Sequence, residues 1–530
     1  MEGSPGAPLW LVDPNDGTRD YLRGQRGSAV SIGLLHERRP VLGVVYAFAY
    51  PDDQGDLFAW AEGSGLVRRN GRPVAPPLPT ELTVTDVVVV SSGAARSPGM
   101  NLECTAPARF RPVPSIAHRL ALVAAGEAAA AVSVHAPGAW DYGAGHALIR
   151  GAGAVLVDEN GREITYNEDG TSNVKRAFAG SEPVARELAQ RRWELTRDNP
   201  EPSSGDFPLR PALGRTVADA GVLSRAQGCL LGQYAGDSLG SLVEFSPAAE
   251  ITARYGDGPR RLEDGGRWGT IAGQPTDDSE MALALARAIV AREGFEAEAV
   301  MEAYRAWHRS SPFDIGQTTA AALSGAPRSE SQANGSLMRV SPLGILAHAR
   351  PAWQAADWAR TDAALTHPHP VCGDATAAYA VAVAHAIGHG TGATPCYEAA
   401  LRWAHEGAAE RAVIEAIERA AVEPPVCEGP KQGWVLVALQ NAFYELLHAS
   451  SLETGVVTTV QRGGDTDTNA AIAGALLGAV YGRAAVPCQW RGMILSCHTH
   501  PHSRWRPRPA TYWPADALEL AERLAWLSRR

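Results

Sequence analysis

The sequence predicts two domains of different class, a β-rich α/β or α+β domain followed by an all-α domain. Three observations lead to this prediction. The chain has 530 residues, more than one domain usually holds. Up to about residue 195, short β-branched runs alternate with turn residues. From about residue 216 onward, long stretches rich in Ala, Leu, Glu and Arg show an apolar period near 3.6.

The first domain, 1–195, is expected to contain short strands, a helix that runs into a strand, and a closing helix. The strands are flanked by Gly or Pro and are predicted at 29–35, 41–47, 84–91 and 154–158. Residues 120–134 are predicted as a helix followed by a strand, and 183–195 as the closing helix. Residues 196–215 contain four prolines and no periodic apolar face, so they are predicted to form a linker.

The second domain, 216–530, is expected to be a set of packed helices whose short loops carry polar clusters. Helices are predicted at 217–240, 279–293, 297–308, 353–364, 374–387, 397–421, 434–447, 468–481 and 514–527. Convincing β runs are few in this part of the chain. An all-α domain follows from this pattern.

Composition excludes several classes of protein. The net charge of −10 disfavours sequence-independent binding to a nucleic-acid backbone. The longest apolar run, 470–482, is shorter than the roughly 20 residues that span a bilayer, and residues 1–8 lack the features of a signal peptide. Seven scattered cysteines without a Cys-x-x-Cys pair indicate reduced thiols. We therefore expect a cytoplasmic protein without a membrane segment, most simply an enzyme.

Two polar clusters stand at predicted helix starts in the second domain. They are 273–280 (GQPTDDSE) and 461–469 (QRGGDTDTN). Helix capping is one explanation, because Asp and Thr are favoured at helix N-termini, but capping needs only one side chain. Four converging carboxylates would repel one another unless cations neutralise them. Oxygen ligands suit Mg²⁺, Mn²⁺ or Ca²⁺ rather than zinc.

These clusters belong to a series of segments that resembles the ADP-ribosylglycohydrolase family, the relatives of the dinitrogenase reductase-activating glycohydrolase. The segments are GCLLGQYAGDSLGSLVEF (228–245), PTDDSEMAL (275–283), ANGSLMRVSPLGI (333–345), LTHPHP (365–370) and GGDTDTNAAIAGALLGAVYG (463–482). They occur in the family's order over residues 223–527. The resemblance implies the all-α fold of that family for the second domain.

Carried over by position, the resemblance implies a binuclear Mg²⁺ site, with Mn²⁺ as a possible substitute. Its ligands would be Thr276, Asp277, Asp278, Asp465, Asp467 and Thr468. Asp278 is favoured over Asp277 as the base that takes a proton from an activated water. Glu244 matches a glutamate that positions this water or gates the substrate, and an exposed glutamate at a helix end is the alternative interpretation.

The same resemblance implies that Asn334, Gly335, Ser336 and His367 bind the substrate, since small residues permit close approach to a ribose or diphosphate. The expected reaction is hydrolysis of the glycosidic bond between ADP-ribose and an acceptor, which is an ADP-ribosylated protein side chain or a small ADP-ribose derivative. The sequence predicts neither the linkage nor the oligomeric state. A non-catalytic ADP-ribose-binding regulator is an alternative that the intact aspartate clusters disfavour.

The first domain carries an acidic motif of its own. WLVDPNDGTRDYLRG (10–24) places two carboxylates three residues apart, and AWDYGAG (139–145) follows much later. A polar turn would explain the first motif alone. Together the two resemble the inositol monophosphatase superfamily over residues 10–195, nearest its adenosine 3′,5′-bisphosphate phosphatase branch. The resemblance implies a layered sandwich with a second Mg²⁺ site at Asp13, the Asn15 carbonyl, Asp16 and Asp141, where Thr18 helps to activate a water.

The sequence departs from the inositol monophosphatase pattern at one point. The family carries a metal-ligating glutamate on helices upstream of the DPxDGT motif, whereas nine residues precede Trp10 here. We therefore expect an incomplete, N-terminally truncated domain with impaired activity. The alternative is an active Mg²⁺-dependent phosphomonoesterase on adenosine 3′,5′-bisphosphate or an inositol phosphate.

A dense Cys/His cluster, CHTHPH, occupies residues 497–502. Zinc binding is one interpretation, but such short spacings fit a tetrahedral site badly. We therefore expect a solvated loop at Cys497–His502.

Overall fold

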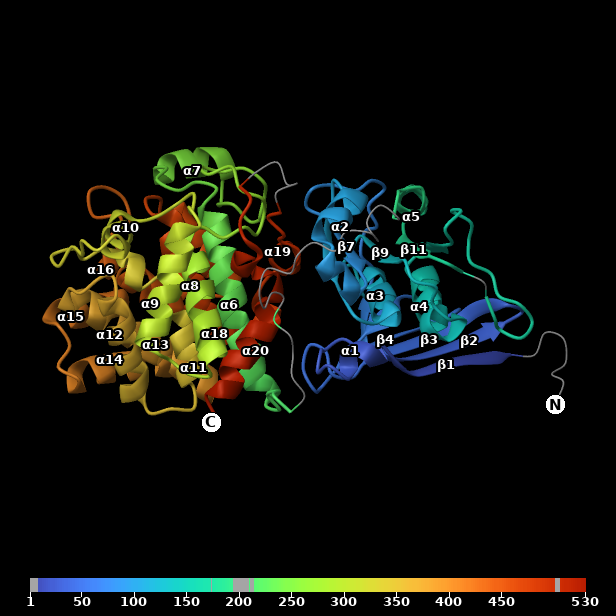
Figure 1. Ribbon diagram of the computed structural model, residues 1–530, viewed down its shortest axis with the longest axis horizontal. Helices are drawn as coiled ribbons and strands as arrows, with labels where there is room; N and C mark the ends of the chain where they lie inside the picture. Colours follow the sequence, from blue (N-terminus) through green and yellow to red (C-terminus); the bar gives the residue numbers. More distant parts are fainter. Residues whose placement is uncertain (1–7, 173, 194–208, 210–213, 501–505) are drawn as a thin grey trace. The chain divides into compact units, whose positions relative to one another are not determined.

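A computed structural model describes residues 8–172, 174–193, 209, 214–500 and 506–530 (Figure 1). The chain splits into an N-terminal unit, Met1–Ser203 with Arg210–Ala218, and a C-terminal unit, Ser204–Leu209 with Asp219–Arg530. The N-terminal unit is α/β and the C-terminal unit is all-helical within the described residues, as the sequence predicts. The predicted linker, 196–215, lies outside the described residues except at positions 209, 214 and 215.

The N-terminal unit contains two β-sheets. The first is antiparallel in the order β1-β2-β3-β4-β5-β6, formed by Leu9–Asp16, Ala29–His36, Arg39–Ala47, Asp56–Ala61, Val67–Arg69 and Arg72–Val74. The second has the order β10-β11-β9-β7-β8, formed by Val155–Val157, Ala177–Gly180, Ala130–Ser133, Val87–Val90 and Arg109–Pro112. In this mixed sheet β7 pairs in parallel with β8 and β9. The predicted strands correspond to β2, β3, β7 and β10.

Helices accompany these sheets. They are α1 (Thr18–Tyr21), the 3-10 helix η1 (Ser92–Arg96), α2 (Pro98–Thr105), α3 (Ile116–Ala124), α4 (Ala139–Gly151) and α5 (Glu182–Ala189). The predicted helix-then-strand at 120–134 is the end of α3 followed by β9, and the predicted closing helix is α5.

Two glycines let α4 lie directly on the antiparallel sheet. A Cβ on Gly43 of β3 would lie 2.1 Å from the carbonyl oxygen of Ala144, and one on Gly33 of β2 would lie 2.8 Å from the Ala144 nitrogen. A side chain at either position would push the helix off the sheet. Ser31 of β2 also donates a hydrogen bond to the carbonyl oxygen of Trp140 (3.1 Å), so the first turn of α4 is held against the sheet.

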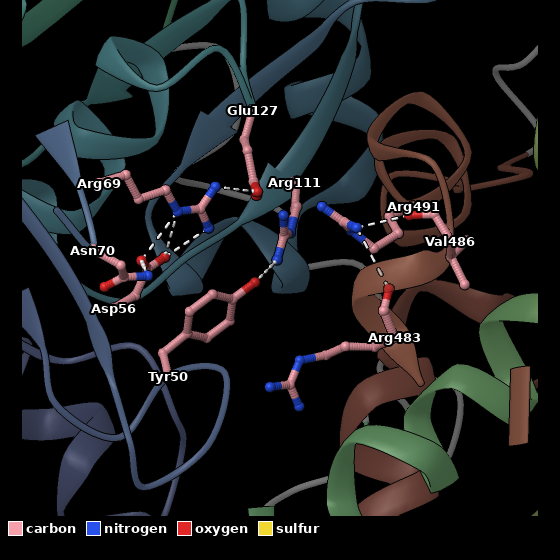
Figure 2. Close-up of polar contacts among 9 residues, drawn as sticks. All are labelled: Tyr50, Asp56, Arg69, Asn70, Arg111, Glu127, Arg483, Val486 and Arg491. Atoms are coloured by element: carbon pink, nitrogen blue, oxygen red, sulfur yellow. Dashed lines mark hydrogen bonds and ion pairs between the residues drawn. The ribbon is translucent and has the colours of Figure 1, made fainter. Parts of the chain in front are cut away.

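Arginine side chains join distant parts of the N-terminal unit (Figure 2). Arg69 of β5 forms ion pairs with Asp56 of β4 (2.6 Å) and with Glu127 between α3 and β9 (2.5 Å). Arg111 of β8 donates to the hydroxyl oxygen of Tyr50, which follows β3 (2.6 Å). Both arginines therefore link segments of the antiparallel sheet to segments of the mixed sheet.

The C-terminal unit contains α6 to α20. Their bounds are Ala220–Gly240, Ala248–Tyr255, Asp277–Arg292, Ala297–Arg309, Gln317–Leu323, Ser341–Ala347, Ala352–Ala364, Pro370–His389, Ala393–Glu406, Arg411–Ala420, Val435–His448, Leu452–Gln461, Thr466–Tyr481, Cys488–Leu495 and Ala517–Leu527. Short 3-10 helices, η2 to η5, occupy Asn334–Ser336, Arg483–Ala485, Ala510–Tyr512 and Pro514–Asp516.

The prediction of one continuous helix over 397–421 is wrong, because the structure has two helices there, α14 and α15. The chain turns at Gly407 and at Ala408, which has a left-handed φ of 47°. The Gly407 and Ala409 nitrogens donate back to the carbonyl oxygens of Trp403 (2.7 Å) and Ala404 (3.0 Å), which ends α14. Alanine and glutamate favour helix on both sides of the turn, so the periodicity alone does not reveal it.

Helix α13 is the one helix of the described residues that is long and apolar enough to cross a membrane by length and composition, with a mean hydropathy of 1.3. However, 83% of that apolar window is buried inside the unit. Its composition is explained by its position in the core of the helical unit.

A seam of glycines joins α6 and α18. On α6, Gly228, Gly232, Gly236 and Gly240 are spaced by four and so share one face. A Cβ on Gly232 or Gly236 would lie 2.1 or 2.0 Å from the carbonyl oxygen of Gly474 or Ala470 on α18. Gly228 faces Gly478, and Gly240 faces Asp467, so the two helices are antiparallel. The end of α6 therefore lies directly against the start of α18.

Residues 506–516, here called the C-terminal strap, connect α8 to two loops. Arg508 donates to both carboxylate oxygens of Glu280 on α8 (2.7 Å each) and to the carbonyl and hydroxyl oxygens of Ser310 (2.9 Å each). Arg506 donates to the carbonyl oxygen of Trp268 (2.8 Å). The strap thus holds the 268 loop and the 310 loop to the same helix.

Candidate active site

The first acidic cluster is built at the start of α8. Asp237, in the last turn of α6, is fully buried and accepts hydrogen bonds from the backbone nitrogens of Thr276 and Ser279 (3.1 Å each) and from the Thr276 hydroxyl (2.9 Å). Asp237 therefore caps α8. Helix capping does not explain the presence of Asp277 and Asp278, because the Asp237 carboxylate already caps this helix.

The two aspartates of this cluster differ in their surroundings. The Asp277 carboxylate accepts a hydrogen bond from the Gly316 nitrogen (3.1 Å). Asp278 accepts one from the Thr276 hydroxyl (2.9 Å) through Oδ2, while its buried Oδ1 has no hydrogen-bond partner. A buried carboxylate oxygen without a partner is costly unless a cation satisfies it.

The second cluster stands at the start of α18, and the glycine seam brings it to the end of α6. The Asp465 carboxylate accepts a hydrogen bond from the Asn334 side-chain nitrogen (2.7 Å), and Asp467 accepts one from the Thr468 backbone (2.9 Å). Carboxylate oxygens of Glu244, Asp465 and Asp467 lie within 4.8 Å of one another. All three residues are buried.

Glu244 is not the exposed helix-end residue of the alternative interpretation, since only 6% of it is exposed. Its carboxylate accepts a hydrogen bond from the indole nitrogen of Trp268 at 2.6 Å. The aspartates of α18 and the 268 loop therefore meet at this side chain.

Two further aspartates, which are not among the residues predicted from the sequence, belong to this acidic region. Asp314 lies in the loop between α9 and α10 and lines the same cleft as Asp277. It stands in FDIGQTT, an Asp, Gly and Thr cluster before a helix, which is the signal used for the other clusters. Asp237 has a weaker signal, a carboxylate inside a helix of small and apolar residues.

The electrostatics of these carboxylates indicate a cation site. Burial, then the charge of Asp465, raises the pKa of Glu244 to about 8. Burial, opposed by the Gly316 hydrogen bond, raises the pKa of Asp277 to about 7, and burial with the charge of Asp277 raises that of Asp314 to about 10. Burial also raises the pKa of Asp278 and Asp467 well above the ordinary range. Bound cations would reverse these shifts, and the all-oxygen donor set fits a hard divalent metal.

The carboxylates open into a cleft of about 920 Å³. Of the predicted ligands and substrate residues, the cleft is lined by Glu244, Asp277, Asp465, Asp467, Thr468, Asn334, Gly335 and His367. Thr276 and Asp278 are buried and do not line it. Ser336 also lies outside its lining, because its hydroxyl faces Thr376 of α13 (3.2 Å).

The prediction of a solvated loop at residues 497–502 is wrong for its first half. Cys497 and His498 are buried, and the His498 ring packs edge-on against Trp513 with centroids 5.3 Å apart. This ring contact helps to bury His498. His502 lies outside the described residues.

The N-terminal unit brings its own acidic residues together at the end of β1. Carboxylate oxygens of Asp13, Asp16 and Asp141 lie within 4.8 Å of one another. The Thr18 hydroxyl donates to the Asn15 carbonyl oxygen (2.6 Å). Burial, opposed by a hydrogen bond from the Gly138 backbone, raises the pKa of Asp141 to about 7. Each residue predicted for this site is thus within one small region.

Comparison with known proteins gives the C-terminal unit relatives. Residues 218–526 match the ADP-ribosylglycohydrolase family. The ADP-ribosyl-dinitrogen reductase glycohydrolase of Rhodospirillum rubrum is 32% identical over 51% of this chain and 90% of its own length. The ADP-ribosylarginine hydrolase Tri1 of Pseudomonas putida is 28% identical over 59% and 86%. A solved ADP-ribosylglycohydrolase-related protein complex is 28% identical, covering 58% of this chain and 99% of that chain with a TM-score of 0.48.

The N-terminal unit is similar to a different family. Residues 1–197 match the inositol monophosphatase family. Inositol monophosphatase 3 of Solanum lycopersicum is 30% identical over 30% of this chain and 59% of its own length. The 3′(2′),5′-bisphosphate nucleotidase of Escherichia coli K12 is 32% identical over 30% and 61%. The chain therefore spans about three fifths of the length of these two relatives.

Proposed function

Because the chain belongs to the ADP-ribosylglycohydrolase family through residues 218–526, we propose that its C-terminal unit hydrolyses, with a bound metal, the glycosidic bond between ADP-ribose and an acceptor. One observation carries the proposal. Glu244, Asp277, Asp314, Asp465 and Asp467 come from four separate segments and line a single cleft. No structural need for so many buried acids in one place is evident.

The donor set supports Mg²⁺ or Mn²⁺ as the metal, and its size supports two ions. Thr276, Asp277, Asp278, Asp465, Asp467 and Thr468 would hold them, together with Asp314. A bound divalent cation lowers the pKa of a water molecule and stabilises charge on ribose oxygens. The chain supplies the oxygen ligands, and the buried setting strengthens their electrostatic effect.

We assign the proton acceptor to Glu244 rather than to Asp278. Glu244 lines the cleft, and the Trp268 indole fixes its carboxylate, whereas Asp278 is 1% exposed and lies behind the lining. The water oxygen bonds to the anomeric carbon as the glycosidic bond breaks, and its proton passes to Glu244. The leaving atom of the acceptor takes a proton from solvent as it departs, and the proton on Glu244 returns to solvent, so that the net reaction consumes one water.

The acceptor class that fits best is the guanidino group of arginine in a protein. The printed names of the relatives, one acting on ADP-ribosyl-dinitrogen reductase and one on ADP-ribosylarginine, support the same class.

The test is release of ADP-ribose by the purified full chain. The substrates are ADP-ribosyl-arginine and ADP-ribosyl-serine peptides, each with Mg²⁺, with Mn²⁺ and with EDTA. We expect metal-dependent release from arginine and loss of activity in Asp467→Asn and Asp314→Asn. Binding of ADP-ribose without turnover of either substrate would favour the non-catalytic regulator instead.

A second activity has its own supporting observation. The grouping of Asp13, Asp16 and Asp141 supports a metal-dependent phosphomonoesterase in the N-terminal unit, acting on a nucleoside bisphosphate or an inositol phosphate. Phosphate release from adenosine 3′,5′-bisphosphate that Asp16→Asn abolishes would support it. Phosphate release that Asp16→Asn leaves unchanged would exclude it.

We also propose that the protein works in the cytoplasm. All seven cysteines lie within the described residues and none of them is in a disulfide, as expected in a reducing compartment. Cell fractionation tests this directly.

A further inference from the structure

We propose that His367 acts as a neutral hydrogen-bond donor to an oxygen of ADP-ribose, and that Arg339 and Thr366 are positioning residues which set the proton on its cleft-facing nitrogen. This inference rests on the proposed function of the cleft. It goes beyond assigning His367 to the substrate, since it names the atom, the protonation state and the residues responsible.

The inference starts from a buried chain of polar contacts behind the cleft. Arg339 and Asp362 form an ion pair whose side chains are both fully buried (3.0 Å), and the Tyr304 hydroxyl donates to the same carboxylate (2.7 Å). Arg339 Nη1 donates to the Thr366 hydroxyl oxygen (2.7 Å). The Thr366 hydroxyl lies 2.8 Å from His367 Nδ1. A permanent charge is thereby connected, through one hydroxyl, to the imidazole.

The chain of contacts determines which ring nitrogen carries the proton. A guanidinium can only donate, so the Thr366 oxygen accepts from Arg339. The single Thr366 hydrogen then has one partner within reach, Nδ1 of His367, which must accept it. If Nδ1 carried a proton instead, the buried Thr366 hydrogen would be left without an acceptor. The proton of the neutral ring therefore resides on Nε2.

Nε2 is the ring nitrogen that remains for a ligand, because Nδ1 is paired with Thr366. His367 is 1% exposed and lines the cleft, and within the described structure Nε2 has no hydrogen-bond partner. A Cβ on Gly335 would lie 3.0 Å from Nε2, so a side chain at position 335 would crowd the imidazole ring. Burial, reinforced by the charge of Arg339, lowers the pKa of His367 to about 3, so the ring stays neutral.

The chemical class of the ligand atom follows from these facts. A neutral N–H donor attracts an oxygen acceptor without adding a positive charge that would repel bound metal ions. ADP-ribose offers two sources of such an oxygen, its diphosphate and its ribose hydroxyls. Binding of ADP, of ribose 5-phosphate and of ADP-ribose, compared between variants, distinguishes the two sources.

The first measurement needs no substrate. Nitrogen NMR of the full chain labelled on histidine distinguishes a protonated from an unprotonated ring nitrogen, and the signals that His367→Gln removes belong to His367. We expect Nε2 protonated and Nδ1 unprotonated, without titration between pH 5.5 and 8. A proton on Nδ1, or an imidazolium in this range, overturns the proposal regardless of what the enzyme hydrolyses.

The second measurement uses Thr366→Val, which removes the hydroxyl and keeps the shape, with Thr366→Ser as the conservative variant. In Thr366→Val we expect a mixture of tautomers and a roughly three- to tenfold weaker Kd for ADP-ribose, the effect of one hydrogen bond. Thr366→Ser should restore both. Thr459→Val is the matched control, because it removes another buried Thr hydroxyl, on α17.

The outcomes separate the two proposals. If ADP-ribose does not bind even the unaltered chain, the proposed function fails, whereas the tautomer result still stands. If ADP-ribose binds but Thr366→Val changes neither its Kd nor the tautomer, the role given to Thr366 and His367 is wrong. An equal weakening in Thr459→Val would show a merely structural effect.

Discussion

Alanine at the two ends of the glycine seam should have similar effects on stability and different effects on activity. A Cβ on Gly240 would lie 2.4 Å from the Asp467 Cα and the Thr466 carbonyl oxygen, and one on Gly228 would lie 2.4 Å from the Gly478 carbonyl oxygen. Ordinary contacts begin at 3.4 Å, so α6 and α18 must separate by about 1 Å at either site.

The expected loss of stability can be worked out from opposing terms. Overpacking against backbone costs up to about 3 kcal/mol, and replacing Gly by Ala inside a helix recovers about 1 kcal/mol. We therefore expect Gly240→Ala and Gly228→Ala each to lower the free energy of unfolding by about 2 kcal/mol. Gly294→Ala is the control, since a Cβ on Gly294 meets nothing within 4 Å.

Activity should separate the two variants. Gly228 lies about 18 Å along α6 from Gly240, far from the carboxylates, whereas Gly240 touches Asp467 itself. A displacement of 1 Å at a reacting centre can cost on the order of 100-fold in rate. We expect such a loss of ADP-ribose release in Gly240→Ala, measured at saturating Mg²⁺ and corrected for the folded fraction, and little loss in Gly228→Ala. Equal activity losses in the two variants would refute the argument that the seam places the proposed metal ligands.

Three further predictions concern charge. Without metal, the C-terminal unit should lose stability from about pH 6 to about pH 8.5. Burial raises the pKa values of Asp277 and Glu244 to about 7 and 8 in the folded protein. Protonation of these two groups therefore favours the folded state below these pH values, and this stabilisation is lost above them. The midpoint of urea unfolding, measured in EDTA across this pH range, checks the prediction. Mg²⁺ should reverse the loss of stability with pH, and a midpoint in EDTA that rises with pH would contradict the prediction. Arg508→Met removes the ion-pair partner of the buried Glu280 and should lower the free energy of unfolding by about 3–5 kcal/mol. Chemical denaturation measures this loss, and a loss below about 1 kcal/mol would contradict the structural role given to Arg508. Asp16→Asn should abolish metal binding by the N-terminal unit in calorimetry while ADP-ribose release stays unchanged.

Local patterns in the sequence predict most of the helices and several of the residues that the structure brings to one cleft. The aspartates of α8 and α18 stand out because acids beside Thr at a helix start are visible in a short window. Asp237 was missed because it acts inside a helix, and its role depends on a contact with Thr276, 39 residues away. The placement of Asp278 behind the cleft, and of Ser336 against α13, likewise depends on packing that no short window contains.

The break between α14 and α15 shows the same limit for the fold. Ala408 adopts a left-handed conformation that alanine seldom takes, at an exposed position. Propensity and periodicity continue through this point, so they do not predict the turn that Gly407 and Ala408 form.

The C-terminal strap has a consequence for how this unit folds. Arg508 reaches back 228 residues to Glu280, so the support of α8 closes only when very distant parts of the chain meet. Contacts of such long sequence separation form slowly, because chain entropy must be lost before they contribute. A nascent chain that has reached α18 carries every proposed metal ligand but not the strap. We expect metal capture to be weak and reversible in that intermediate and to become tight only after the strap has docked.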